Sequence, residues 1–142
     1  MDQKSKMDIF EAELAKHPQV HLPLIHRFTP GMYIREIFMP SGTVLTSMRH
    51  KTRHPFVVLE GVAEVIDEQG RSEILTAGHL GVTDPGTRRV IRIHADCRWA
   101  TFHVTENTDP DEIADEITEN TNPLLAKDFV PICFEKRNLI TS

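Results

Sequence analysis

Residues 42–61 read GTVLTSMRHKTRHPFVVLEG. This pattern predicts a strand, a short polar connection that carries two histidines, and a second apolar strand that ends at a glycine turn. Side chains at even spacing share one face of a strand, so Met48 and His50 are expected on the same side. His54 follows where the chain enters the next strand. We therefore expect both imidazoles to converge at the mouth of a barrel, where they suit metals such as Fe, Zn, Cu or Ni.

Short runs rich in Val, Ile, Thr and Phe continue on both sides of this stretch, separated by turn signals such as Pro30-Gly31 and Asp84-Pro85-Gly86. Eight strands are predicted, near residues 20–28, 31–39, 43–50, 56–66, 71–76, 79–84, 88–94 and 98–104. Ala95-Asp96 is the turn expected between the last two. Eight short strands at this spacing are typical of an antiparallel sandwich or barrel.

Two short helices are predicted to flank the strands. Met7–Lys16 has apolar residues at helical spacing (Ile9, Phe10, Leu14 and Ala15), and Pro18 ends it. Asp109 and Pro110 are typical of an N-cap and first helical position, and this second helix is expected to run to about Glu119. Residues 122–142 are apolar in patches, so we expect this arm to dock on the barrel or on a neighbouring subunit.

Composition and charge fit one globular domain. Hydrophobic residues make up 39% and charged residues 26%, and the formal charge is −5; 142 residues leave room for one core. Seven acids and no Lys or Arg lie in residues 106–119, so the rest of the chain, with 14 acids against 16 bases, is mildly basic. We expect an N-terminal helical extension (1–19), a barrel (20–105), and an acidic helix with a C-terminal arm (106–142).

Several function classes have no support in the sequence. No run approaches the roughly 20 apolar residues of a membrane helix, and the charged N-terminus lacks the apolar core of a secretory signal. Cys97 and Cys133 form no CxxC pair, so we expect reduced thiols in a cytoplasmic protein. Nucleotide, hydrolase and zincin motifs are absent. The barrel is not strongly basic, so nucleic acid is not an expected partner.

Residues 42–61 resemble the first sequence motif of the cupins, G-x5-H-x-H-x(3,4)-E-x6-G, with every spacing kept. Met48 stands where the first metal histidine belongs, His50 matches the second, and His54 takes the place of the glutamate. The second motif, G-x5-P-x-G-x2-H-x3-N, is met loosely by residues 78–93, where Arg89 or Val90 falls at the histidine position.

The resemblance covers about residues 38–104 and implies an all-β fold: a cupin-type double-stranded β-helix, or jelly-roll barrel, with short N- and C-terminal helices. The phrases His-Lys-Thr-x-His, Pro-Gly-Thr-x-Arg and Trp-x3-His are similar to those of small cupin-like proteins encoded by phages and prophages. That resemblance implies no established reaction.

His103 is the best candidate for a third metal ligand, because it lies in the last barrel strand and shares a face with Trp99. His94 is the next choice. A trio of His50, His54 and His103 would hold a divalent metal (Fe, Zn, Ni or Mn) and leave positions open for water or substrate. In the alternative interpretation these histidines are hydrogen-bonded polar residues of a pocket that holds no metal.

Basic residues beside the histidines favour an anionic ligand. They form two groups: Arg49, Lys51 and Arg53, then Arg88, Arg89 and Arg92. At the barrel mouth they would bind a carboxylate, phosphate or sugar acid; otherwise they form a solvated rim or pair with the acidic helix. We predict Met48, Arg89 and Trp99 as ligand-binding residues, although Trp99 also fits a core position.

Two functions fit these residues. The first is a small-molecule-binding cupin with a divalent metal, acting on an anionic small molecule as an oxygenase or isomerase. No acid–base pair stands out, since Glu60 adjoins the glycine turn, so catalytic residues are not assigned. The second is a non-enzymatic, phage-encoded binding or assembly module with a vestigial pocket. In both cases we expect a homodimer that pairs through sheet edges or the C-terminal arm.

Overall fold

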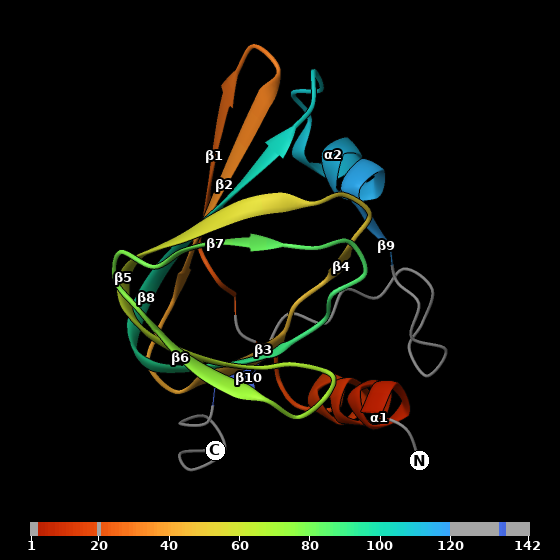
Figure 1. Cartoon of the computed structure of the whole chain (residues 1–142), viewed down its shortest axis with the longest axis vertical. Coiled ribbons are helices and arrows are strands. Elements are labelled where there is room, and N and C mark those ends of the chain that lie inside the picture. The colour runs from red at the N-terminus through yellow and green to blue at the C-terminus, as the bar shows by residue number, and fades with distance from the viewer. Residues whose placement is uncertain (1–2, 20, 120–133, 136–142) are drawn as a thin grey trace.

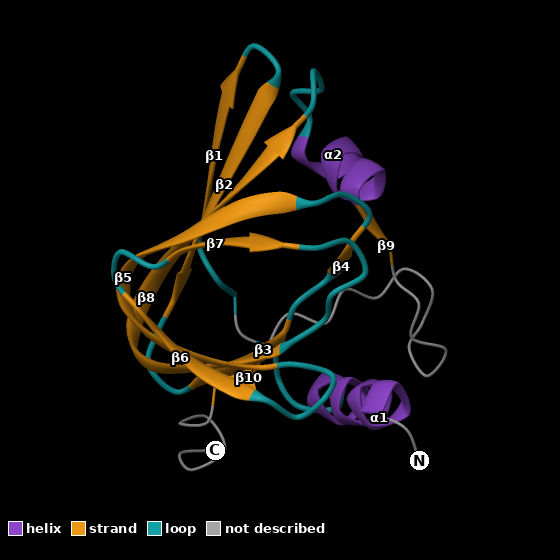
Figure 2. Ribbon diagram, in the orientation of Figure 1, coloured by secondary structure: helices purple, strands orange, loops and turns teal. Residues whose placement is uncertain are grey.

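Antiparallel strands make up most of the computed structural model, which describes residues 3–19, 21–119 and 134–135 (Figures 1 and 2). In chain order its elements are α1 (Gln3–Ala15), β1 (Leu24–Thr29), β2 (Met32–Met39), β3 (Thr43–Thr46), β4 (Arg49–His50), β5 (His54–Ile66), β6 (Ser72–Thr76), β7 (Leu80–Thr83), β8 (Val90–Val104), α2 (Pro110–Ile117), β9 (Thr118–Glu119) and β10 (Phe134–Glu135).

One eight-stranded sheet curls into a barrel, and β8 is the strand of its wall that joins the other parts of the sheet (Figure 1). β8 pairs with β2, β3 and β5, and β5 pairs in turn with β6 and β7. β1 and β10 extend the sheet beyond β2 and β3, and all of these pairs are antiparallel. A separate two-stranded sheet joins β4 to β9.

The turn predicted at Ala95-Asp96 is wrong, because β8 runs through these residues as one strand from Val90 to Val104. Its pairing with β5 shifts register between Val58 and Ala63, so bulges bend both long strands where a turn was expected. Gly61 makes this bend possible. Its φ is +92°, and a Cβ at this position would lie 2.2 Å from the carbonyl oxygen of Asp96.

Other boundaries differ by a few residues. The strand predicted at 43–50 is divided into β3 and β4, and β1 begins at Leu24. α1 begins at Gln3 and buries Met7, Glu11 and Leu14. Of the four apolar residues at helical spacing, Leu14 is buried and Ala15 half-buried, whereas Ile9 and Phe10 are exposed. α2 starts as predicted, with Asp109 as N-cap, but ends at Ile117 because the next two residues pair with β4.

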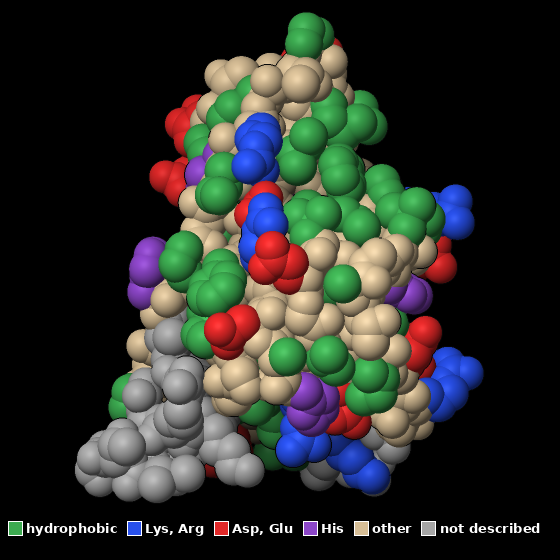
Figure 3. All heavy atoms as spheres, turned by 90° about the vertical axis from the view of Figure 1, so that its left-hand side faces the viewer, with side chains coloured by type: hydrophobic (Ala, Val, Ile, Leu, Met, Phe, Trp, Pro, Cys, Tyr) green, Lys and Arg blue, Asp and Glu red, His purple; other side chains and the backbone are tan. Residues whose placement is uncertain are grey.

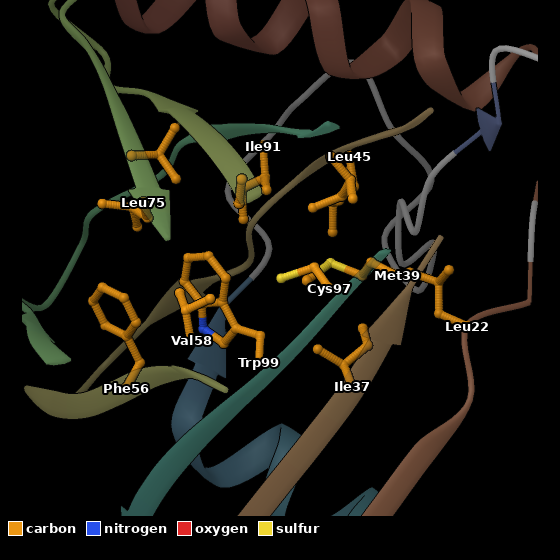
Figure 4. Close-up of a cluster of buried hydrophobic side chains, with 13 residues drawn as sticks. Leu22, Ile37, Met39, Leu45, Phe56, Val58, Leu75, Ile91, Cys97 and Trp99 are labelled. Atoms are coloured by element: carbon orange, nitrogen blue, oxygen red, sulfur yellow. The ribbon is translucent and has the colours of Figure 1, made fainter. Parts of the chain in front are cut away.

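Apolar side chains from β2, β5 and β8 fill the barrel (Figure 4). The members of this core are Leu22, Ile37, Met39, Leu45, Phe56, Val58, Ala63, Val65, Leu75, Ile91, Ile93, Cys97 and Trp99. A second buried cluster, formed by Tyr33, Ile113 and Ile117, joins α2 to β2. The amide of Lys51 also donates to the carbonyl of Ile117 at 2.7 Å, so α2 is held against the segment that follows His50.

Several large apolar side chains remain exposed on the strands, including Leu80, Ile74 and Val104. Figure 3 shows apolar side chains mixed with basic and acidic ones over one face of the molecule. No helix among the described residues is long and apolar enough to cross a membrane. Residues 134–135 of the predicted C-terminal arm pair with β3, and the rest of that arm, with Cys133, lies outside the described residues.

Candidate metal centre

Three histidines from three strands meet at the end of the barrel beside α2. His50 lies on β4, His54 begins β5, and His103 lies near the end of β8. Each offers a ring nitrogen, and these atoms all lie within 4.8 Å of one another. The ring centroids are 4.3 Å apart for His50 and His54, 4.7 Å for His54 and His103, and 5.3 Å for His50 and His103. Three neutral imidazoles at this spacing could bind one metal ion.

Strand register explains the convergence of the three rings. Thr101 faces Phe56 across the β5–β8 pair, and opposed residues point to the same side of a sheet. His103 and His54 each lie two residues from that pair, so they share its inward face. His50 is on the short strand β4, whose partner is Thr118 of β9. The position of His50 therefore depends on α2 and β9, far along the sequence.

Hydrogen bonds determine which ring nitrogens are available. Nδ1 of His54 lies 3.2 Å from the carbonyl oxygen of Thr52. Because a carbonyl oxygen can only accept, Nδ1 must carry the proton of this hydrogen bond. In a neutral ring the lone pair of Nε2 is then available for a metal. Nε2 of His103 lies 2.9 Å from Oγ1 of Thr101. Nδ1 of His103 is buried and has no hydrogen-bond partner within the described residues. A buried nitrogen without a partner is costly, and a metal ion would satisfy it.

Burial keeps the three histidines neutral. The pKa of His103 is lowered to about 3, chiefly by desolvation and in smaller part by the charges of His54, His50 and Arg35. Desolvation also lowers the pKa of His50 to about 4, with contributions from His54, Arg35 and Arg89. The pKa of His54 is lowered by the same burial. At neutral pH all three rings therefore keep the lone pairs that metal binding requires.

These pKa values predict that the metal-free protein loses stability on mild acidification. Histidines of an unfolded chain have a pKa near 6.5, so below that pH the unfolded state binds protons that the folded state does not bind. The free energy of unfolding is therefore at its full value above about pH 6.5 and decreases as the pH falls toward the lower pKa values of the folded state. We expect the free energy of unfolding in urea, with a chelator present, to fall between about pH 7 and pH 5, above the usual carboxyl range.

The matched variants in this experiment are His103→Asn, in which the fall with pH should be smaller, and His94→Ala, in which it should match that of wild type. A wild-type free energy of unfolding that stays flat across this range would contradict the assignment of neutral, buried histidines.

Arg89 is the one basic residue of the two predicted groups whose charge lowers the pKa of the site histidines His50 and His54. Its Nη2 donates to Oγ1 of Thr83 at 3.0 Å, and its guanidinium lies 5.3 Å from the ring centroid of Phe56. The other members make contacts elsewhere: Arg49 with Glu68, Lys51 with the Asp115 carbonyl, Arg53 with Asp84, Arg88 with Asp8 and Glu11, and Arg92 with Glu64.

The remaining candidates are placed as follows. Trp99 is buried in the core, stacked on Phe56 with centroids 4.8 Å apart, and Met48 lies half-buried two residues before His50. A ligand contact for either stays a prediction. His94 is half-exposed and bonds to Glu64 at 3.0 Å, outside the histidine trio. Glu60 is exposed and pairs with Arg98 at 3.0 Å.

Arg35 was missed by the sequence analysis. It lies on β2 opposite Thr101 and lowers the pKa of His50 and His103. The signal was available: Arg35 interrupts an alternating series of buried residues formed by Tyr33, Ile37 and Met39.

Solved structures with the same fold include an uncharacterized conserved protein with a double-stranded β-helix domain from Klebsiella pneumoniae, with a TM-score of 0.53, 14% identity, and coverage of 70% of this chain and 90% of that chain. The chain has the cupin fold. Ectoine synthase from P. lautus matches this cupin barrel with a TM-score of 0.56 and 14% identity over 80% of this chain and 88% of that chain. A DMSP lyase from Ruegeria pomeroyi matches with a TM-score of 0.52 and 14% identity over 62% and 49%.

At this identity the likeness establishes the cupin fold alone. No protein-family model matches the sequence, and no curated protein does. The resemblance to phage-encoded proteins therefore stays a prediction.

Proposed function

We propose that this chain is a small-molecule-binding cupin in which His50, His54 and His103 hold a divalent metal. The observation that carries the proposal is the meeting of one ring nitrogen from each of three neutral histidines within 4.8 Å. In addition, the buried Nδ1 of His103 has no hydrogen-bond partner among the described residues. Imidazole ligands suit Fe, Ni and Zn, whereas Mn prefers carboxylate oxygens. Because no described carboxylate belongs to the cluster, we expect Fe, Ni or Zn in preference to Mn.

The ligand is a small anion that Arg89 orients through charge-assisted hydrogen bonds. Thr52 and Thr101 hold His54 and His103 in fixed orientations, as outer-shell partners of metal-binding histidines do. When bound, the metal would polarise a ligand oxygen or lower the pKa of a bound water. An oxygenase or isomerase acting on the anion is the enzymatic form of this proposal.

A non-enzymatic binding module is the second candidate. It is favoured by the lack of an acid–base pair at the trio among the described residues, since Glu60 is exposed and paired with Arg98. In this second candidate the pocket is vestigial, so the two candidates differ in whether the site binds a metal and an anion as well as in turnover.

The test is a calorimetric titration of chelator-treated protein with Zn²⁺, Ni²⁺, Mn²⁺ and, under anaerobic conditions, Fe²⁺. We expect one metal ion per chain for Zn²⁺, Ni²⁺ or Fe²⁺, and a higher thermal midpoint, because a ligand that binds only the folded state stabilises it. If none of the four metals binds or raises the thermal midpoint, the proposal is overturned. One equivalent bound equally well by a His50→Ala/His54→Ala variant would overturn it too.

A further inference from the structure

Arg35 carries a positive charge on the inward face of strand β2. The side chains of β2 that alternate inward are Tyr33, Arg35, Ile37 and Met39, and three of the four are buried and mostly apolar. Arg35 lies opposite Thr101 in the β2–β8 register, and Tyr33 lies opposite His103. Opposed residues share a face, so Arg35 is on the same side of the sheet as His103.

This charge has no acidic partner in the described part of the chain. Arg35 forms no ion pair and no side-chain hydrogen bond among residues 3–19, 21–119 and 134–135. Burial lowers its pKa, with only a small opposing contribution from Tyr33. An arginine remains charged in spite of such a shift, and a partly buried charge without a partner is costly. An anionic ligand would give the Arg35 guanidinium a partner.

Arg89 is a second partly buried cation. Within the described residues it forms no ion pair, although the charge of Glu73 acts on its pKa, and its buried Nε has no hydrogen-bond partner. The charge of Arg89 lowers the pKa of His54, whereas the charge of Arg35 lowers that of His103, and both act on His50. Strand pairing agrees with this: Arg35 shares the inward face of β2 with Tyr33, which lies opposite His103, and Arg89 donates to Thr83, which lies opposite His54 in the β5–β7 pair.

The positive charges of Arg35 and Arg89 favour a ligand with two negative groups. The three histidines are neutral, so a divalent metal among them would keep its charge of two, and the arginines would add two more. Guanidinium binds a carboxylate through two parallel hydrogen bonds. A single carboxylate that pairs in this way with one arginine would leave the other without an anion.

From this arrangement we infer that the site binds a small dicarboxylate, one carboxylate for each of Arg35 and Arg89. This inference rests on the proposed function as an anion site at the histidine trio. It does not require the metal, because strand pairing places Arg35 and the hydrogen bond to Thr83 holds Arg89 independently of it.

The experiment compares malonate and succinate with acetate and inorganic phosphate as calorimetric probes, in the metal-free and the Zn²⁺-loaded protein. We expect at least one dicarboxylate to bind about 10-fold or more tightly than acetate and phosphate, a difference of about 1.4 kcal/mol. Arg35→Gln and Arg89→Gln should each remove this preference. Arg53→Gln, at an exposed arginine paired with Asp84, should retain it.

Folding of the variants is checked by thermal unfolding. Because Arg35 has no described acidic partner to leave behind, Arg35→Gln should keep or raise the midpoint of the metal-free protein. Arg35→Lys keeps the charge but lacks the planar fork, so it should give an intermediate preference and serves if the glutamine variant does not fold.

The outcomes separate this inference from the metal proposal. Equal binding of acetate and both dicarboxylates, tighter binding of phosphate, or a preference that survives in Arg35→Gln would overturn the dicarboxylate. A protein that binds no metal yet prefers dicarboxylates would overturn the metal proposal and support the paired arginines.

Discussion

The His50→Ala/His54→Ala variant is expected to bind Zn²⁺ more than about 100-fold more weakly than the wild-type protein. Loss of one outer-shell partner of a metal ligand typically costs about 10–100-fold, and this variant removes two direct ligands from a site of three. The remaining imidazole of His103 cannot form a chelate alone. Calorimetric titration of chelator-treated protein measures the change, with near-ultraviolet circular dichroism to confirm that the barrel is folded.

Two single variants make the prediction specific. His103→Ala should weaken metal binding in the same direction, because His103 is the third member of the trio and its buried Nδ1 has no partner among the described residues. His94→Ala should leave metal binding unchanged, since the half-exposed His94 bonds to Glu64 on the outer surface. Wild-type affinity in the double variant would place any bound metal elsewhere. A large loss in His94→Ala would show that the trio is wrongly composed.

Local patterns in the sequence account for much of this site. Alternation and the glycine and proline turns predict the strands, and even spacing places His103 on the face of Trp99. The convergence of His54 and His103 then follows once β5 and β8 pair with Phe56 opposite Thr101, whereas His50 also needs the β4–β9 pair. His94 was the weaker choice in the sequence, and on the continuous strand β8 its odd separation from His103 turns it to the other face.

What the sequence did not predict depends on contacts between distant segments. Ala95-Asp96 has the composition of a turn, but pairing with β5 carries the strand through it as a bulge. Arg35 interrupts the alternation of Tyr33, Ile37 and Met39, but only the β2–β8 register places it opposite Thr101, on the side of the sheet that holds His103. Ile9 and Phe10 of α1 have the spacing of a buried face but are partly exposed.

A buried ion-pair cluster explains which side of α1 packs against the barrel. Arg88 is buried, and its Nη2 lies 2.6 Å from Oδ1 of Asp8 while its Nη1 lies 3.3 Å from Oε1 of Glu11. The other oxygen of Glu11 accepts a hydrogen bond from Thr46 at 2.6 Å. Glu11 and Arg88 are 77 positions apart, so no window of the sequence reveals that the helix turns a carboxylate inward.

Replacing Arg88 with methionine is expected to lower the free energy of unfolding by about 3–5 kcal/mol, since removing one partner of a buried ion pair leaves the other charge uncompensated. The remaining carboxylates would be Glu11, which is 4% exposed, and the partly buried Asp8. Urea unfolding near neutral pH measures the loss. Arg53→Met is the matched control; its pair with Asp84 has side chains 69% and 72% exposed, so it should cost less than about 1 kcal/mol.

Removing the charges of Asp8 and Glu11 tests whether the unpaired carboxylates cause the loss of stability. In Arg88→Met, adding Asp8→Asn and Glu11→Gln should recover part of the lost free energy, because a buried ionic group replaced as a whole is often close to neutral for stability. If the loss were only a packing defect at methionine, the added substitutions would give no recovery. α1 buries few apolar side chains, chiefly Met7 and Leu14, so the cluster is its main attachment to the barrel. Amide hydrogens of α1 should therefore exchange faster in Arg88→Met than in wild type, while those of β8 near the histidines stay protected.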